Sequence, residues 1–355
     1  MTNKLIIFGG GGFIGSTYYL EHHQRFDEII IIDWFKEPTH SDSYLKTRLK
    51  DQLKPNTILI ECNIYEIEEY QQHLLDASHI LILNADTGTG SSFSSPYHST
   101  NFNSNILSFL IEKIRKYHQN LKLLTIIFTS SRAVYGEGFW LCPTHGRVEI
   151  SRGEYLISKK LQCPKCSVRL NLAGTPEGTT TQPLSVYGAN KLFSEKLLEL
   201  LFKNEVKKLI ILRPQNVYGA GQSRKNPYTG LINWFSESLI QNQDIEIYEH
   251  GLIQRDFVEV RDVVRAINKS IFEYEGSFNI FNVGSGTPTT LIELAEILKE
   301  LFNSKSKIRI TGKFRNGDVL GALSSNENIS DSLNFEAGIS LSEGLENYSE
   351  WFLNS

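Results

Sequence analysis

Tyr187 and Lys191 lie four positions apart in a segment with the pattern of a helix. Residues with this spacing share one helix face, so we expect the phenol and the ammonium to project together. A neighbouring ammonium favours the phenolate and lowers the pKa of a tyrosine from its usual value of about 10. The pair could therefore act as a general base near neutral pH. The same spacing is also typical of a solvated helix face. Other motifs of the chain are therefore needed to distinguish a general base from an exposed pair.

Three of the four cysteines form two short knuckles with a histidine, Cys142 with His145 and Cys163 with Cys166. Three sulfurs and one imidazole at this spacing fit a tetrahedral Zn²⁺ site without an open position, which is typical of a structural metal. The alternative is that these side chains only pack a loop. A nucleic-acid-binding zinc ribbon is disfavoured by the acidic balance of the chain. The remaining cysteine, Cys62, is interpreted as a small buried hydrophobe.

A glycine-rich turn follows the first strand-like run, residues 4–8, and precedes a helical pattern that begins at Ser16. Its glycines fit two registers, 9-12-15 and 10-12-15. Glycines let the backbone approach a pyrophosphate, and a helix N-terminus favours its negative charge. The next strand-like run, 28–32, ends at Asp33, which can accept hydrogen bonds from the ribose hydroxyls of an adenosine and would repel a 2′-phosphate. The unit predicts dinucleotide binding, with NAD preferred over NADP.

Strand-like runs and helical patterns alternate further along the chain. The strands are expected at 57–61, 80–83, 123–128 and 208–212, and the helices at 66–75, 101–117 and 186–203. This alternation predicts an α/β fold with a doubly wound parallel sheet covered on both faces. Ligand groups in such a fold belong at the carboxyl ends of the strands. The residues at those ends are Asn63, Ala85, Asp86, Ser130, Ser131 and Asn216.

The length of 355 residues predicts a large domain and a smaller partner. We expect a dinucleotide-binding domain over 1–213, interrupted by the cysteine insertion at 142–166. A smaller, mixed substrate domain is expected over 214–355. Residues 253–284 are expected to return to the first domain, because 278–283 has the pattern of a strand of the large sheet.

The chain has 36 basic and 40 acidic residues, a formal charge of −4, so its composition predicts neither a nucleic-acid nor a membrane partner. Apolar runs stay well short of the roughly 20 residues that a membrane helix needs. The first residues do not have the pattern of a signal peptide. The cytoplasm is therefore the expected location.

These motifs together resemble the extended short-chain dehydrogenase/reductases and, within them, the NAD-dependent nucleotide-sugar epimerase/dehydratase family. The resemblance covers nearly the whole chain and rests on motifs in the family's order. They are the glycine turn with Asp33, the serine motif at 128–136, the Tyr187–Lys191 pair, and the segments 212–219, 254–258 and 315–318. The resemblance implies a Rossmann-type fold with Ser131, Tyr187 and Lys191 as the catalytic residues.

The resemblance also assigns ligand-binding positions. The NAD-binding residues that it implies are Gly9, Gly12, Phe13, Ile14, Gly15, Asp33, Asn63, Ile64, Ala85, Asp86, Asn101, Tyr187, Lys191 and Pro214. The substrate-binding residues that it implies are Thr87, Ser131, Arg132, Asn216, Arg255, Arg315 and Asp318. In the family the asparagine faces the substrate pyrophosphate and the two later arginines clamp it. A planar guanidinium can bind phosphate oxygens bidentately, which a lysine cannot.

Two positions after the serine distinguish the reactions of the family. Members that eliminate water carry an Asp-Glu pair where this chain has Arg132 and Ala133, and decarboxylating members have an acid at the position of Ala133. Epimerisation needs neither. Segments 87–91 and 226–230 and the cysteine insertion are similar to the 4-epimerases of dTDP-6-deoxyhexoses such as dTDP-rhamnose. Asn84 departs from the family's small apolar residue and puts the nicotinamide ribose contacts in doubt.

The implied reaction is 4-epimerisation of a dTDP- or UDP-hexose through a 4-keto intermediate, with hydride taken up by NAD and returned to the opposite face. Tyr187 would remove the 4-hydroxyl proton, Ser131 would bind the same oxygen, and Lys191 would hold the nicotinamide ribose. The alternatives are an NAD(P)H-dependent 4-keto-sugar reductase and a non-catalytic NAD-binding sensor. The resemblance further implies a role in polysaccharide biosynthesis and a homodimer that pairs through 101–117 and 186–203. The insertion is expected to overhang the sugar pocket.

Overall fold

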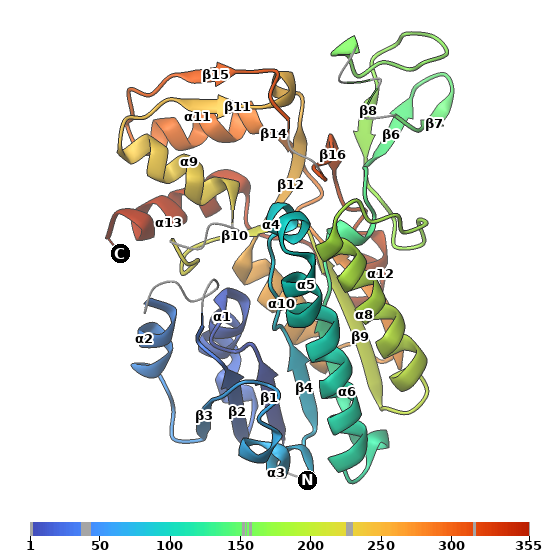
Figure 1. The fold of residues 1–355 in the computed structure, drawn as a ribbon, viewed down its shortest axis with the longest axis vertical. Helices are drawn as coiled ribbons and strands as arrows, with labels where there is room; N and C mark the ends of the chain where they lie inside the picture. The colour runs from blue at the N-terminus through green and yellow to red at the C-terminus, as the bar shows by residue number, and fades with distance from the viewer. Residues whose placement is uncertain are drawn as a thin grey trace.

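The computed structural model describes residues 3–36, 44–150, 153, 155, 158–224, 230–314 and 317–354. Its centre is a seven-stranded parallel sheet in the order β3-β2-β1-β4-β5-β9-β13 (Figure 1). The strands are β1 (Lys4–Phe8), β2 (Glu28–Asp33), β3 (Thr57–Glu61), β4 (His79–Ile82), β5 (Thr125–Thr129), β9 (Lys208–Pro214) and β13 (Phe278–Val283). The doubly wound α/β fold that the sequence predicts is confirmed.

Helices cover both faces of this sheet, so each strand contributes to two cores. Successive side chains of a strand point to opposite faces. Ile6 and Phe8 of β1 therefore pack toward α6 (Ile106–Tyr117) and α8 (Val186–Phe202), whereas Leu5 and Ile7 pack toward α1 (Phe13–His22) and α10 (Val260–Phe272). This double burial is why the strands read as continuous apolar runs.

Several element boundaries differ from the sequence expectation. The first helix begins at Phe13 rather than Ser16, because Gly12 is already its N-cap. The helix expected over 101–117 starts as a π-helix, Asn101–Asn105, before α6 begins. The pattern at 66–75 folds as a 3₁₀ turn, Ile67–Glu69, followed by the short helix α3 (Gln71–Leu74).

The C-terminal part has its own core between α9 (Leu231–Ile240), α11 (Leu291–Leu301) and α13 (Leu341–Asn354). Two small sheets belong to it. The first contains β10 (Asn216–Tyr218), β12 (Gln254–Glu259), β14 (Pro288–Thr290) and β16 (Gly321–Ala322), and the second contains β11 (Ile245–Ile247) and β15 (Ile308–Ile310). Within 253–284, α10 covers the large sheet and β13 pairs with β9, whereas β12 belongs to a small sheet.

The segment between the serine and tyrosine motifs forms a three-stranded antiparallel sheet from β6 (Phe139–Cys142), β7 (Gly146–Val148) and β8 (Asn171–Ala173). It extends beside β16 at the upper right of Figure 1. Among the helices of the described residues, none is long and apolar enough to cross a membrane.

Candidate active site

The glycine turn leaves the N-terminus of α1 open to a cleft at the carboxyl end of the sheet. Gly9 adopts φ +78°, and a Cβ there would lie 2.6 Å from the backbone nitrogen of Asn84. A Cβ on Gly15 would lie 2.5 Å from the carbonyl oxygen of Gly9. Both positions therefore need glycine, and the turn exposes backbone rather than side chains, as a bound pyrophosphate requires.

Asp33 lies at the end of β2 beside this turn. Its carboxylate accepts hydrogen bonds from the backbone nitrogens of Gly11, at 2.9 Å, and Phe35, at 3.0 Å. The cleft around it is lined by Gly9, Gly12, Asp33, Trp34, Phe35, Lys36, Asn63, Ile64, Leu83, Asn84, Ala85, Asp86, His98, Phe102 and Ile106. The bare turn and the carboxylate fit the adenosine half of NAD.

A second cleft continues from the first one, because both include the turn glycines and Ala85. It is lined by Gly9, Gly12, Phe13, Ile14, Gly15, Leu83, Ala85, Thr87, Thr129, Ser130, Ser131, Arg132, Ala133, Tyr187, Lys191, Pro214, Gln215, Asn216, Val217, Gln222, Gly230, Arg255, Gly317 and Asp318. All three residues expected to be catalytic are in this set, together with six of the seven expected substrate residues.

Local structure brings Tyr187 to the serine. The side chain of Ser185 caps α8 by accepting a hydrogen bond from the nitrogen of Gly188 at 3.0 Å, so Tyr187 lies in the first helical turn. Gly188 packs directly on the serine loop, where a Cβ would lie 2.5 Å from the carbonyl oxygen of Ala133. The Ser131 hydroxyl lies close enough to the Tyr187 phenol to lower the pKa of that phenol. Two groups that can share one substrate oxygen are thus adjacent.

The electrostatics of Tyr187 differ from what the spacing predicts. Burial raises the pKa of Tyr187 to about 12, only partly offset by the hydrogen bond with Ser131, and Asp86 raises it further. Burial also lowers the pKa of Lys191 to about 7, while Glu195 opposes this shift. The expected lowering by the ammonium is therefore wrong for this state of the cleft. Desolvation dominates both groups, and a lysine with this pKa is charged only part of the time at pH 7.

Two arginines, Arg132 and Arg255, line the second cleft. Arg255 is 7% exposed and donates from Nη2 to Asp318 Oδ1, at 2.5 Å, and to the carbonyl oxygen of Val319, at 2.7 Å. Arg132 donates to the carbonyl oxygen of Gly136. Burial lowers the pKa of Arg132 to about 10, and Arg255 contributes in the same direction. The two guanidinium groups place positive charge at the surface of the cleft, where it can bind an anionic part of a ligand.

Two carboxamides at the end of β9 carry oxygens that lack hydrogen-bond partners among the described residues. They are Asn216 Oδ1 and Gln215 Oε1. Asn216 was expected in the substrate site, but Gln215 was not. Because burying an acceptor without a donor is unfavourable, both oxygens point to a ligand that supplies donors. The sequence feature that could have indicated Gln215 is its position as a polar residue directly after the largely apolar strand β9.

Some of the predicted ligand positions do not line the second cleft. Asn101 opens the π-helix and lines neither cleft, because its side chain is engaged with Asn105 at 3.4 Å. Asp86 faces the adenosine cleft, where its carboxylate lies 3.8 Å from His98 Nε2. Arg315 lies outside the described residues, as does most of the segment 226–230.

The four predicted metal ligands converge, with all ligand atoms within 4.8 Å of one another. His145 Nδ1 is 3.6 Å from both Cys142 Sγ and Cys163 Sγ, and the sulfurs of Cys142 and Cys166 are 3.5 Å apart. Zn–S bonds of about 2.3 Å and Zn–N bonds of about 2.05 Å give tetrahedral edges of about 3.8 Å and about 3.6 Å. The donor set and its spacing fit a closed zinc site.

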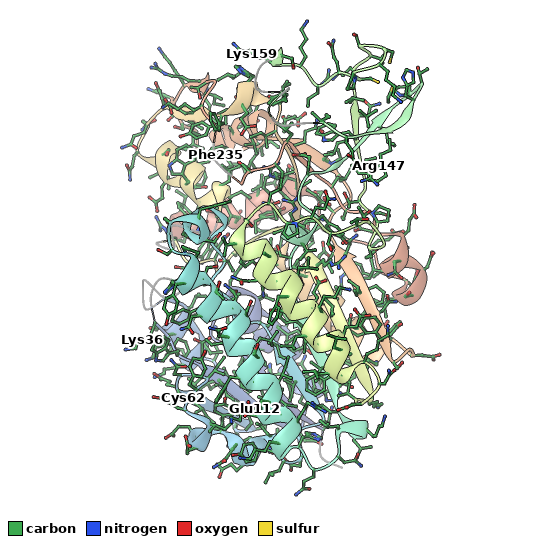
Figure 2. The ribbon with its side chains drawn as sticks, turned by 45° about the vertical axis from the view of Figure 1, so that its right-hand side comes forward. Lys36, Cys62, Glu112, Arg147, Lys159 and Phe235 are labelled. Carbon is green, nitrogen blue, oxygen red and sulfur yellow. The ribbon has the colours of Figure 1, made fainter. Side chains whose placement is uncertain are left out.

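The insertion is expected to overhang the sugar pocket. None of the described residues of 142–173 lines either cleft. The insertion packs instead against the C-terminal part, through Leu252 and Leu320. Figure 2 shows Arg147 and Lys159 of the insertion at the end of the molecule opposite Cys62 and Glu112.

Comparison with known proteins gives a consistent assignment. A sequence model of the NAD dependent epimerase/dehydratase family matches residues 5–162 and 166–284. A dTDP-L-rhamnose 4-epimerase of Burkholderia thailandensis is 28% identical over 358 residues, covering 98% of this chain and 94% of the relative. The structure of a UDP-glucose 4-epimerase of Thermotoga maritima with UDP-glucose is 25% identical with a TM-score of 0.77, covering 99% of each chain. A UDP-glucuronic acid 4-epimerase of Bacillus cereus with its ligand and NAD, 20% identical with a TM-score of 0.80 over 99% of each chain, shares the fold.

Proposed function

The chain belongs to the NAD dependent epimerase/dehydratase family, and from that premise we propose that it catalyses the 4-epimerisation of a nucleotide-sugar. The observation that carries the proposal is that Ser131, Tyr187 and Lys191 line one cleft together, with Lys191 one turn after Tyr187 on the same helix. Arg132 and Ala133 follow the serine, so the acids that dehydration or decarboxylation would use there are missing. A sensor that only bound NAD would not need these groups in one cleft.

In the proposed reaction Tyr187 accepts the proton of the sugar 4-hydroxyl as a phenolate, a form that the positive charge of bound NAD⁺ would favour, and Ser131 hydrogen-bonds the same oxygen. NAD, when bound, supplies the hydride acceptor and donor for C4. Lys191 lies deeper in the cleft and holds the ribose next to the nicotinamide. Arg255 and the side-chain NH2 group of Asn216 bind the pyrophosphate side of the substrate, which leaves the hexose next to the tyrosine.

For the substrate we propose a dTDP-6-deoxyhexose, on the basis of the dTDP-L-rhamnose 4-epimerase that matches this chain over nearly its whole length. UDP-hexoses are the competing class, because the solved relative from Thermotoga maritima was captured with UDP-glucose. The product of either reaction would enter polysaccharide biosynthesis.

We also propose that Cys142, His145, Cys163 and Cys166 bind a structural Zn²⁺. The tetrahedral spacing of their donor atoms supports this. Such a site needs reduced thiols, so it is compatible with a reducing compartment such as the cytoplasm.

A homodimer is proposed to form through α6 and α8. Leu200 and Phe193 on α8 are 81% and 50% exposed, which is unusual for large apolar residues on one helix face. Light scattering would test the assembly, and Leu200→Glu would be expected to give a monomer.

The function is tested by proton NMR of the purified protein with dTDP-rhamnose, UDP-glucose and UDP-N-acetylglucosamine in separate reactions without added cofactor. A new anomeric signal with one of them would support a 4-epimerase that carries its own NAD. Consumption of added NADH with a 4-keto sugar, and no epimerisation, would instead identify a reductase.

A further inference from the structure

Leu320 joins the C-terminal part to the metal-ligand insertion. Its side chain is fully buried in a cluster whose other members come from 140–170, the segment that contains the insertion. The other members are Trp140, Cys142, Tyr155, Leu161, Cys163 and Leu170. Two of the four metal ligands therefore pack in the same cluster as Leu320.

The backbone next to Leu320 is held by the stem of the insertion. Glu137 accepts a hydrogen bond from the nitrogen of Leu320 through Oε2 and from that of Gly321 through Oε1, both at 2.9 Å. Glu137 Oε1 also accepts from Trp140 Nε1 at 3.3 Å. Gly321 packs so closely that a Cβ would lie 2.4 Å from Leu172. The NH groups of this segment thus face the insertion.

The carbonyl groups of the same segment accept hydrogen bonds from β12, which carries Arg255. Arg255 donates to the carbonyl oxygen of Val319, at 2.7 Å, and to that of Leu320, at 3.5 Å. The nitrogen of Gln254 donates to the Leu320 carbonyl oxygen at 2.9 Å, and β12 pairs with β16 at this point. Asp318, which completes the guanidinium contacts, begins the segment. Residues 318–321 therefore lie between the insertion and Arg255.

We propose that the insertion is a positioning element for nucleotide-sugar binding: it holds residues 318–321, and these hold the guanidinium of Arg255. This inference rests on the proposed function, in which Arg255 binds the pyrophosphate. It replaces the expected role of the insertion as a flap over the sugar. The insertion sets affinity for the nucleotide part and leaves the proton-transfer groups unchanged.

The physical reason is that the insertion is small and its core depends on cross-links. A bound metal would keep Cys142 and Cys163 in place. The buried cluster to which they belong can then enclose the side chain of Leu320. Without the metal, the loop between the two knuckles gains conformational freedom. The carbonyl groups that orient Arg255 would then be less well defined, and coupling between two sites typically changes ligand affinity by about 5- to 150-fold.

The test compares three variants with the wild type as purified holoprotein. Leu320→Ala removes most of the leucine side chain from the buried cluster. Glu137→Gln removes one of the two carboxylate acceptors, and Cys163→Ser removes a metal ligand. Leu294→Ala is the matched control, because Leu294 is equally buried but belongs to the core of α11. Each protein is assayed for zinc by elemental analysis, for bound NAD, for the affinity of dTDP and UDP by calorimetry, and for KM and kcat.

We expect nucleotide affinity to fall about tenfold or more in Leu320→Ala and Cys163→Ser, and less in Glu137→Gln. KM should rise in parallel while kcat, bound NAD and the pH profile stay near the wild type. Zinc should be lost only in Cys163→Ser. Unchanged nucleotide affinity in Leu320→Ala and Cys163→Ser would overturn the inference, and so would an equal loss in Leu294→Ala. A wild type that binds neither nucleotide and converts no nucleotide-sugar would instead refute the proposed function.

Discussion

The ammonium of Lys191 donates a hydrogen bond to the backbone carbonyl oxygen of Thr129 at 2.9 Å. Thr129 ends β5, two residues before Ser131, so this contact ties the helix that carries Tyr187 to the strand that leads to the serine. Lys191 is only 3% exposed and lies 4.7 Å from the centre of the Phe128 ring. The same burial that fixes its position also lowers its pKa to about 7.

This pKa predicts how the stability of the NAD-free protein depends on pH. Between pH 7 and about 10.5, the unfolded state keeps a proton on Lys191 that the folded state has lost. The free energy of unfolding should therefore rise with pH across this window and lose that contribution as pH falls toward 7. Chemical denaturation of the wild type and Lys191→Met at pH 7, 8 and 9 isolates the effect. Parallel pH profiles for the two proteins would contradict it.

Tyr187→Phe should lower kcat by about 10²- to 10⁴-fold, because a phenyl ring cannot accept the proton of the 4-hydroxyl. Bound NAD should remain, since the ring still fills its place beside Ser131. NMR of the substrate and the NAD content of the same preparation provide the two measurements. Turnover that survives the substitution would remove Tyr187 from the mechanism.

Local patterns predicted the positions of these groups but not their chemistry. The tyrosine and lysine spacing, the glycine turn and the two cysteine knuckles are short-range features, and each was found in place. The pKa of Tyr187 was predicted in the wrong direction, because burial depends on strands and loops that lie far away in the sequence. The contact of Glu137 with Leu320 joins residues 183 positions apart, and no local pattern indicates it.

Arg213 and Glu195 form a buried ion pair that holds α8 against β9. Arg213 Nε and Nη2 donate to the two carboxylate oxygens of Glu195 at 2.9 Å and 2.6 Å, and both side chains are almost fully buried. Arg213→Met leaves an unpaired buried carboxylate, so it should lower the free energy of unfolding by about 3–5 kcal/mol.

Chemical denaturation would measure this cost, with Arg309→Met as the matched control. Arg309 pairs with Asp244 on the surface, where solvent and salt screen the attraction, so this variant should lose little stability. Similar losses in the two variants would show that burial of the Arg213 pair adds nothing.

A substitution of Gln215 is expected to weaken substrate binding without lowering the free energy of unfolding. Its side chain is 6% exposed, it lines the substrate cleft, and among the described residues Oε1 has no hydrogen-bond partner. The oxygens of a pyrophosphate only accept hydrogen bonds, so this acceptor must receive a hydroxyl or an NH group of the bound ligands. Leaving such an acceptor unpaired costs about 1–3 kcal/mol in the free protein.

Gln215→Leu should therefore raise KM about tenfold, because the ligand loses its acceptor, while the free energy of unfolding stays the same or rises. Asn268→Leu is the control: Asn268 lies on α10, away from both clefts, and its Oδ1 is likewise buried without a partner among the residues that the structure describes. That variant should change stability alone. Steady-state kinetics of both variants would measure KM, and chemical denaturation would measure the free energy of unfolding. An unchanged KM in Gln215→Leu would mean that the carboxamide does not contact the substrate.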